Sequence, residues 1–334
     1  PSSNGGSISA ADFSGDGYAD LFIGNRSIPG GYGLSPTSAI VASAPESDAY
    51  FEAVAQAPLG MVTDSEFVDI NADGFLDLVV VGDFMPVTIL LNDGNGSFSN
   101  QTTALGLGKT SGFWNTVEVA DINGDGRLDL LAGNAGINHK WKPSQTEPVV
   151  AYLDDFDGNS SLDPILFYSF FGQPVPFASK DKLVSSLPYL KKKFLKYSDF
   201  ASVTDIVSLT DKTEIFETKA VVEMRSMVFI QQADGTFSGS ALPFEAQLST
   251  IEDFYAEGTK VYYVGNYSGY VSELGPSLAN AGGVLADFDG TQFKSHSTLG
   301  LPLGTEARAI DRISDEQLLI VVNNGPALRI ESKN

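Results

Sequence analysis

Four stretches of the chain place oxygen-bearing side chains at the same offsets of 0, 2, 4 and 8 residues. The clearest reads D-I-N-G-D-G-R-L-D, from Asp121 to Asp129, with Gly126 at offset 5. Ca²⁺ takes six to eight oxygen ligands at roughly 2.3–2.6 Å, and a loop with a ligand at every second residue can curl around one ion. Glycine permits the sharp bend that such a loop needs. The spacing therefore predicts a site for a hard cation in each stretch.

We call these stretches acidic loops 1 to 4 (residues 12–20, 69–77, 121–129 and 155–163). The residue at offset 6 is expected to add its backbone carbonyl while its side chain points away, which explains how Arg127 is tolerated. Loop 4 carries Ser160 at the bend and is the weakest match, so three or four structural Ca²⁺ ions are predicted. The predicted ligands are Asp12, Ser14, Asp16, Tyr18 and Asp20; Asp69, Asn71, Asp73, Phe75 and Asp77; Asp121, Asn123, Asp125, Arg127 and Asp129; and Asp155, Asp157, Asn159, Ser161 and Asp163.

The EF-hand is the obvious rival for such loops, and the flanking residues argue against it. An EF-hand needs a bidentate Glu at position 12 and a helix on each side. Position 12 is Ile23, Val80, Ala132 or Leu166 in the four loops, and the flanks are short apolar runs rich in β-branched residues. Such runs indicate strands, so the loops are expected to be strand-to-strand turns. For any single loop, ordinary turn chemistry remains an open alternative, because Asp, Asn and Gly dominate turns.

The composition excludes several classes of protein. The chain has 334 residues and a net charge of −22, so nucleic acid is not an expected partner. It has no Cys, which excludes disulfides, thiolate catalysis and thiolate metal sites. No apolar run is long enough to predict a transmembrane segment. The chain begins with Pro1, and we expect a mature or trimmed product; weak calcium sites fill at extracellular calcium levels, which favours an exported protein.

Strand-turn-strand units recur along the chain with a period near forty to fifty residues, and such a period predicts a repeat architecture. The second unit ends in a strong hairpin signal, Asn92 to Gly96. Two later units place Asp253 and Asp311 at offset 0, but Val261 and Leu319 stand at offset 8, so the full ligand set is lost there. We predict one all-β domain over residues 1–334, a β-propeller of six or seven four-stranded antiparallel blades. A β-solenoid, which has shorter repeats, is the alternative.

Residues 179–209 interrupt the strand pattern. Apolar residues recur there at helical spacing, and Pro188 divides the stretch into short helices. The same stretch holds six Lys residues, which form either a solvated face or a docking surface for an acidic partner or for lipid. The apolar stripe consists of Leu183, Leu187, Leu190, Phe194 and Tyr197.

The segments A-D-I-N-G-D-G-R-L-D-L-L-A-G-N, V-D-I-N-A-D-G-F-L-D-L-V-V-V-G and L-L-N-D-G-N-G-S-F resemble FG-GAP repeats, also called VCBS repeats. The run from Gly112 to Leu195 is most similar to the C-terminal region of large exported Bacteroidota proteins with these repeats. The resemblance implies a propeller with Ca²⁺ in its hairpin turns, on an extracellular or cell-surface protein associated with the outer membrane.

Three functions are compatible with these residues. The first is a non-enzymatic, calcium-stabilised module that binds a protein or a glycan, with no catalytic residue. The second is a polysaccharide-active enzyme or a lectin-like glycan binder, because His139 and Trp141 share an irregular loop in which Trp could stack on a sugar and His could act as a base. The third is an accessory subunit of an outer-membrane nutrient-uptake assembly, docked through residues 179–209. Serine hydrolase chemistry is a poor match, because there is no G-x-S-x-G motif and only two His.

Overall fold

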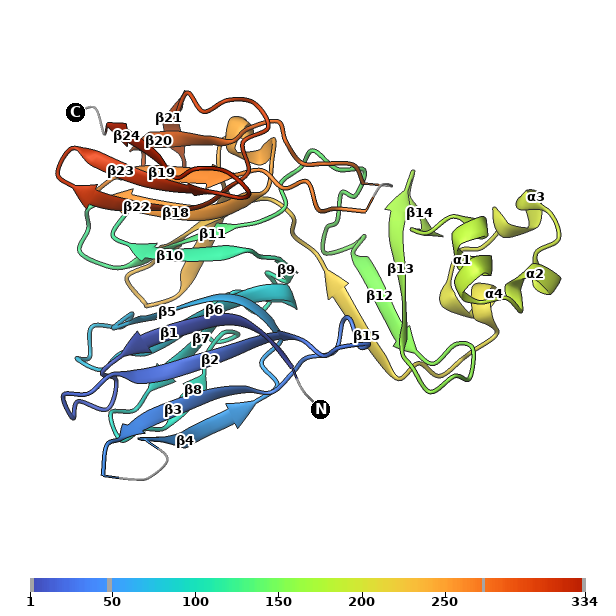
Figure 1. Cartoon of the computed structure of the whole chain (residues 1–334), viewed down its shortest axis with the longest axis horizontal. Coiled ribbons are helices and arrows are strands. Elements are labelled where there is room, and N and C mark those ends of the chain that lie inside the picture. The colour runs from blue at the N-terminus through green and yellow to red at the C-terminus, as the bar shows by residue number, and fades with distance from the viewer. Residues whose placement is uncertain (1–2, 47–49, 272–273, 332–334) are drawn as a thin grey trace.

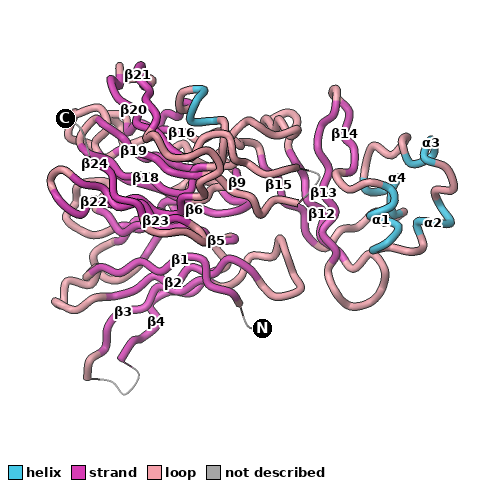
Figure 2. The backbone as a smooth tube through the Cα atoms, turned by 45° about the horizontal axis from the view of Figure 1, so that its top comes forward, coloured by secondary structure: helices cyan, strands magenta, loops and turns pink. Residues whose placement is uncertain are grey.

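The computed structural model describes residues 3–46, 50–271 and 274–331, and most of these lie in antiparallel β-sheets (Figure 1 and Figure 2). The described residues form six sheets, of which five follow one another as blades 1 to 5. Blade 1 contains β1 (Asn4–Ala11), β2 (Asp20–Ser27), β3 (Ser38–Ala44) and β4 (Tyr50–Ala57); blade 2 contains β5 (Met61–Val68), β6 (Asp77–Met85), β7 (Thr88–Asn92), β8 (Phe98–Asn100) and the short β9 (Gly112–Phe113), which pairs with β6.

The remaining blades repeat this meander. Blade 3 contains β10 (Thr116–Ala120), β11 (Asp129–Gly133), β16 (Met227–Gln231) and β17 (Phe237–Ala241); blade 4 contains β18 (Ile251–Glu257), β19 (Lys260–Gly265), β20 (Gly282–Phe288) and β21 (Phe293–Thr298); blade 5 contains β22 (Ala307–Ser314), β23 (Gln317–Val322) and β24 (Leu328–Glu331). A 3₁₀ turn, Phe244–Gln247, links blades 3 and 4. The expectation of a mostly β chain with several four-stranded antiparallel sheets is confirmed, and blade 5 has three strands within the described residues.

The structure departs from the expected serial order at one sheet. Acidic loop 4 belongs to an inserted sheet that interrupts blade 3 between β11 and β16. Blade 3 is completed when Leu131 pairs with Val228 after the insertion. A strand-turn-strand pattern specifies a hairpin but not which later strand joins it, so the sequence alone could not place this sheet. The inserted sheet runs β14 (Gln173–Pro176), β13 (Asp163–Phe170), β12 (Val149–Asp154) and β15 (Glu217–Val221).

The helices predicted near residues 179–209 cover the inserted sheet. Leu183, Leu187, Leu190 and Phe194 are buried, as the helical stripe predicts, and they pack in one cluster against that sheet. Tyr197 is exposed instead, and its hydroxyl donates to Asp181 at 2.6 Å. None of the helices in the described ranges is long and apolar enough to cross a bilayer. The helices are α1 (Lys180–Ser186), α2 (Leu190–Lys193), α3 (Tyr197–Phe200) and α4 (Ile206–Thr210).

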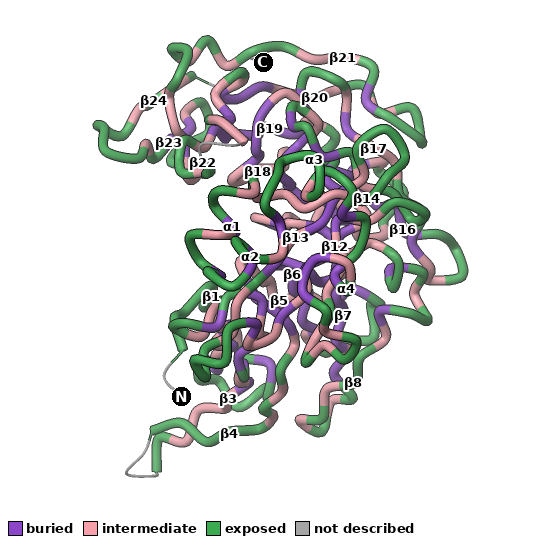
Figure 3. The backbone as a smooth tube through the Cα atoms, turned by 90° about the vertical axis from the view of Figure 1, so that its right-hand side faces the viewer, coloured by how far each residue is buried: buried purple, intermediate pink, exposed green. Residues whose placement is uncertain are grey.

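Successive blades pack face to face, with their first strands β1, β5, β10, β18 and β22 side by side. Each pair of neighbours shares its own apolar cluster; Phe22 and Val80, for example, meet between blades 1 and 2. The second strands of blades 2 and 3 are covered on both faces, which is why β6 is a nearly continuous apolar run and both β6 and β11 are buried along their whole length. Figure 3 looks onto the end that carries the inserted sheet and shows the buried segments gathered toward the centre of the fan of blades.

Partly buried carboxylates also connect the blades. Four of them lie on the first strands of blades 2 to 4, and each accepts a backbone N–H from the first strand of the next blade. The pairs are Asp64 with Val117 (3.0 Å), Glu66 with Val119 (3.1 Å), Glu118 with Ala256 (3.0 Å) and Asp253 with Ile310 (2.8 Å). Within the described residues, neighbouring blades are separate sheets without backbone hydrogen bonds between these strands, and the carboxylates provide the hydrogen bonds between them.

Candidate metal loops and the axial cavity

Acidic loops 1, 2 and 3 each join the first and second strands of blades 1, 2 and 3, at the left-hand end of Figure 1. Loop 4 makes the equivalent turn between β12 and β13 of the inserted sheet. The turns of blades 4 and 5 differ, because only residues 258–259 and 315–316 separate their paired strands. These short turns leave no loop in which a cation could be wrapped. Asp253, which aligns with the first ligand, lies within β18 and bonds to blade 5 instead.

The four acidic loops share one backbone path with two left-handed residues, at offsets 3 and 5. Glycine occupies most of these positions, as its freedom at positive φ allows. Ala72 (φ 57°) and Ser160 (φ 67°) are the exceptions. The bend predicted at offset 5 is therefore present in loop 4 although a Ser stands there. The other positions are Gly15, Gly17, Gly74, Gly124, Gly126 and Gly158, with φ from 75° to 91°.

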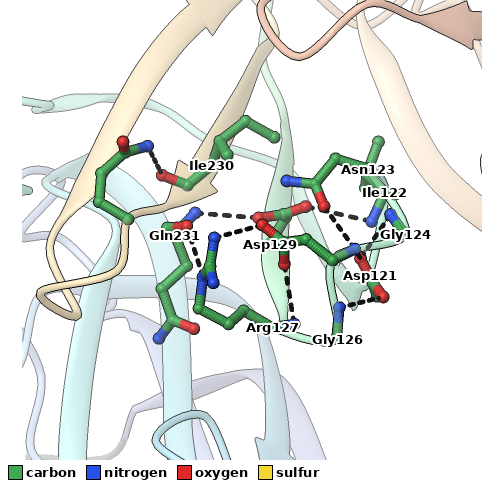
Figure 4. Close-up of polar contacts among 11 residues, drawn as sticks. Asp121, Ile122, Asn123, Gly124, Gly126, Arg127, Asp129, Ile230 and Gln231 are labelled. Atoms are coloured by element: carbon green, nitrogen blue, oxygen red, sulfur yellow. Dashed lines mark hydrogen bonds and ion pairs between the residues drawn. The ribbon is translucent and has the colours of Figure 1, made fainter.

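The first Asp of each loop holds the turn together by accepting backbone N–H groups. In loop 3, Asp121 accepts from Gly124, Asp125 and Gly126 at 2.8, 3.1 and 2.8 Å (Figure 4). The last Asp, Asp129, accepts from the early loop residue Ile122 and from the next strand of the blade. Asp12, Asp69 and Asp155 repeat the first arrangement, and Asp20, Asp77 and Asp163 repeat the bond back into the loop.

Loop 4 brings three carboxylates together. One oxygen each of Asp155, Asp157 and Asp163 lies within 4.8 Å of the others. Hard cations such as Ca²⁺ prefer carboxylate oxygens, and a shared centre at this spacing is open to one ion. The loop that matches the sequence pattern least well thus places its carboxylates in a compact group.

Arg127 of loop 3 does not point away from the loop as expected. Its guanidinium contacts the Asp125 carboxylate. Its Nε donates to the carbonyl of Gln231 at 3.1 Å (Figure 4). Attraction between opposite charges two residues apart explains this fold-back. A cation bound by Asp125 would have to compete with the guanidinium.

The loop carboxylates repel one another where they are buried. Burial raises the pKa of Asp77 to about 6; N–H groups of Asn92 and Ile70 oppose the rise, and the charges of Asp73 and Asp69 add to it. Burial raises the pKa of Asp129 and of Asp163 in the same way. A cation in the loop would relieve this repulsion.

A cavity of about 460 Å³ lies at the opposite end of the blades from acidic loops 1 to 3. Arg26 on β2 and Asp83 on β6 line it, and each stands six residues along its strand from the last Asp of the loop. At 3.3 Å per residue this separates the cavity from the loops by roughly 20 Å. We call it the axial cavity. Its rings are Tyr32, Phe113, His139, Trp141, Phe177, Tyr267 and Tyr270, and its polar residues are Arg26, Asp83, Asn115, Glu252 and Arg308.

The charged groups of the axial cavity are paired. Arg26 donates to Asp83 through Nε and Nη2 at 3.2 and 3.1 Å, and Arg308 contacts Glu252 at 2.6 Å. Burial raises the pKa of Asp83, while Arg26 opposes the rise. The Arg308 guanidinium also lies over the Tyr267 ring, 5.0 Å from its centre.

His139 and Trp141 both line this cavity and are almost fully buried, at 8 % and 6 % exposure. Trp141 packs against Phe113 and Phe177, and His139 against Tyr270. The sequence therefore identified two residues of the cavity, His139 and Trp141. It missed Arg26, Asp83, Glu252 and Arg308, because they come from four different blades and share no local motif.

Comparison with known families identifies the repeats. Residues 4–32 match the model described as FG-GAP repeat, and residues 69–132 match the model described as FG-GAP-like repeat. The first match covers loop 1 with its two strands, and the second runs from the start of loop 2 into β11. No curated protein matches the chain. FG-GAP repeats fit a β-propeller and are typical of extracellular domains, and the matched residues of this chain lie in blades 1 to 3.

Proposed function

We propose that this chain is a non-enzymatic, calcium-stabilised β-propeller that serves as a binding module of an extracellular or cell-surface protein. The observation that carries the proposal is the common geometry of the acidic loops. All four combine left-handed residues at offsets 3 and 5 with a first Asp that accepts the backbone N–H groups of the bend. A shared backbone path in four separate loops is better explained by a shared ligand than by unrelated turns.

The residues of the loops suit a hard cation. Every side chain predicted as a ligand offers oxygen, and the backbone N–H groups engage only part of each carboxylate, which has about four lone-pair sites. Asp12, Asp69, Asp121 and Asp155 would hold the ion from the first position, together with the other side chains at offsets 2, 4 and 8. Bound Ca²⁺ supplies positive charge that offsets the mutual repulsion of the carboxylates.

Binding to the native loops alone would stabilise the fold by mass action. One site at a free ion concentration of a hundred times Kd contributes about 2.7 kcal/mol. Because loops 1 to 3 each connect the two inner strands of a blade, this contribution would act on three hairpins of the propeller core.

Thermal unfolding with calcium and with EDTA tests the proposal. We expect chelation to lower the melting temperature, and calcium to restore it more effectively than magnesium, which prefers rigid octahedral sites. The double variant D121N/D125N should reduce the bound calcium, measured by elemental analysis, by one ion per chain.

The matched control is E316Q, which removes one exposed acidic charge in the tight turn of blade 5. E316Q should bind as much calcium as the parent protein and respond equally to EDTA. An unchanged melting temperature of the parent protein on chelation, with no bound calcium, would contradict the proposal.

The pairing of the cavity carboxylates with arginines favours a binding role over a catalytic one. Asp83 and Glu252 each contact an arginine. A general acid has to carry a proton, and contact with an arginine favours the ionised carboxylate instead. The matching test is a hydrolysis assay on polysaccharides, in which we expect no product from the calcium-loaded protein.

A protein partner is the second candidate, and the far end of the inserted sheet favours it. Phe171 at the tip of the β13–β14 hairpin and Leu195 between α2 and α3 are 92 % and 78 % exposed. Large apolar side chains exposed on a protruding element suit a protein contact. If Phe171 and Leu195 contact a partner protein, the double variant F171S/L195S should recover less of that partner when the complex is purified from outer membranes. The same variant should bind as much calcium as the parent protein.

A further inference from the structure

We propose that the axial cavity binds a neutral saccharide, with Trp141 donating a hydrogen bond to it and His139 accepting one from it. This inference deepens the proposed binding function by naming a site and a class of ligand. It rests on the geometry of one end of the propeller, roughly 20 Å from acidic loops 1 to 3.

The first observation is a pair of buried ring nitrogens without partners. Trp141 Nε1 and His139 Nδ1 make no hydrogen bond within the described residues. A buried polar group left unsatisfied costs about 1–3 kcal/mol, so such groups are rare and call for a partner. Both residues line the same cavity, and surrounding atoms cover both nitrogens, so a ligand bound there would reach them once neighbouring side chains shift.

The hydrogen-bonding roles of the two nitrogens follow from their surroundings. Nε2 of His139 lies 2.9 Å from the carbonyl of Ala135, and a carbonyl only accepts, so Nε2 carries the hydrogen and Nδ1 is an acceptor. Burial lowers the pKa of His139, which keeps the ring neutral. The indole Nε1 of Trp141 is a donor only. A hydroxyl group both donates and accepts, so a ligand with several hydroxyls can satisfy both nitrogens.

The charges of the cavity favour a neutral ligand. Arg26 and Arg308 balance Asp83 and Glu252, and each arginine contacts one of these carboxylates. An anionic ligand would have to displace a carboxylate from an arginine, and a cationic one would have to displace an arginine. A neutral polyol can instead add hydrogen bonds to pairs that stay intact.

The volume and the aromatic side chains of the cavity suit a sugar. Its volume of about 460 Å³ falls within the range of roughly 300–1,000 Å³ that small-molecule sites occupy. Phe113, Trp141 and Tyr267 add aromatic surface beside the polar groups. The apolar face of a sugar ring packs on such surface while its hydroxyls reach the polar groups.

The first test is a glycan array of neutral and uronic-acid oligosaccharides, probed with the calcium-loaded protein. The strongest neutral oligosaccharide is then titrated by calorimetry. We expect W141F and H139F to lose about three- to tenfold in affinity each, the range that one hydrogen bond contributes. Phe keeps an aromatic ring in both positions but lacks the ring nitrogens.

The other tryptophan provides a matched control. Trp114 is fully buried, and its Nε1 already donates to the carbonyl of Thr110 at 2.9 Å. W114F removes the same atom from a satisfied site, so it should lower the melting temperature and leave the affinity for the saccharide unchanged. It also leaves Trp141 as the only tryptophan, so its fluorescence should change when the saccharide binds.

The melting temperatures of the variants without saccharide show whether each variant is folded. W141F should lower the melting temperature less than W114F, because both variants lose the same ring volume but only W114F loses a satisfied hydrogen bond. An array with no signal or with acidic glycans alone, or unchanged affinity in both W141F and H139F, would overturn the proposal. The response of the melting temperature to EDTA is measured separately, so failure here is distinguishable from failure of the calcium proposal.

Discussion

The carboxylate of Asp64 on β5 accepts a hydrogen bond from the backbone N–H of Val117 on β10 at 3.0 Å, and so ties the innermost strand of blade 2 to that of blade 3. Glu66, Glu118 and Asp253 make equivalent bonds between neighbouring blades. Burial takes these carboxylates out of water and raises the pKa of Glu66 to about 8 and those of Glu118 and Asp253 to about 7. The inner strands of neighbouring blades are therefore joined through carboxyl groups whose pKa values are raised.

We expect the stability of the protein to depend on pH through Glu66, which faces the charges of Glu118 and Asp64. Its pKa is higher in the native state than in the unfolded chain. The native state therefore binds more protons between about pH 4.5 and 8, and stability that is present at low pH is lost as pH rises through that window. The variant E66Q keeps an acceptor for Val119 without the charge. Its stability relative to the parent protein should grow by roughly 1–3 kcal/mol from pH 6 to pH 8.

Urea unfolding at saturating calcium measures this change. E316Q, which removes a charge from an exposed turn, should show the same pH dependence as the parent protein. An effect of E66Q that is equal at pH 6 and pH 8 would mean that Glu66 does not titrate in this range.

Ala72 and Ser160 adopt left-handed conformations that cost a residue with a Cβ atom about 1–2 kcal/mol. We expect A72G and S160G each to raise the free energy of unfolding by roughly 0.5–1 kcal/mol, since added freedom of the unfolded chain offsets part of the gain. The opposite change, G126A, should lower it by about 1 kcal/mol. A Cβ at Gly126 meets no atom within 4 Å, so G126A isolates the backbone effect. Denaturant unfolding that gives all three variants the same sign would refute this reading.

We expect loop 3 to bind calcium more weakly than the same loop without an arginine, because the Arg127 guanidinium contacts Asp125. Replacing Arg127 with Phe, the residue that loop 2 has at this offset, removes the competing charge. Both side chains of the pair are partly exposed, and exposed pairs contribute at most about 1 kcal/mol, so R127F should raise calcium affinity by no more than about fivefold. Calorimetric titration measures this, with R225F as a control outside the loops.

The Arg26–Asp83 pair should be important for stability. Asp83 is nearly buried, so R26M would leave its carboxylate without its positive partner, and we expect a loss of roughly 2–4 kcal/mol at neutral pH. The loss should shrink at lower pH, because an unpaired buried carboxylate has a raised pKa and takes up a proton. R225M breaks a more exposed pair with Glu223 and should cost less than about 1 kcal/mol. Equal losses for R26M and R225M would show that burial of Asp83 is unimportant.

Local patterns were sufficient for the hairpins and their turns. The D-x-N-x-D-G spacing of Asp121 to Asp129 specifies a bend with glycine at positive φ, and the structure has it. The burial of Leu183, Leu187 and Leu190 likewise follows from their helical spacing. Such features depend on residues a few positions apart, whose backbone preferences and periodicity can be read directly.

Pairing over long distances in the chain was decided only by tertiary structure. Leu131 joins Val228 across the inserted sheet, and nothing in the neighbourhood of either residue specifies the other. The axial cavity is a stronger case, since Arg26, Asp83, Glu252 and Arg308 lie on four blades. The sequence by itself determined the strands, the turns and the oxygen-bearing side chains that the turns present. Which strands meet, and which side chains share a cavity, depended on how apolar faces of separate sheets pack, because many sheet orders bury the same residues equally well.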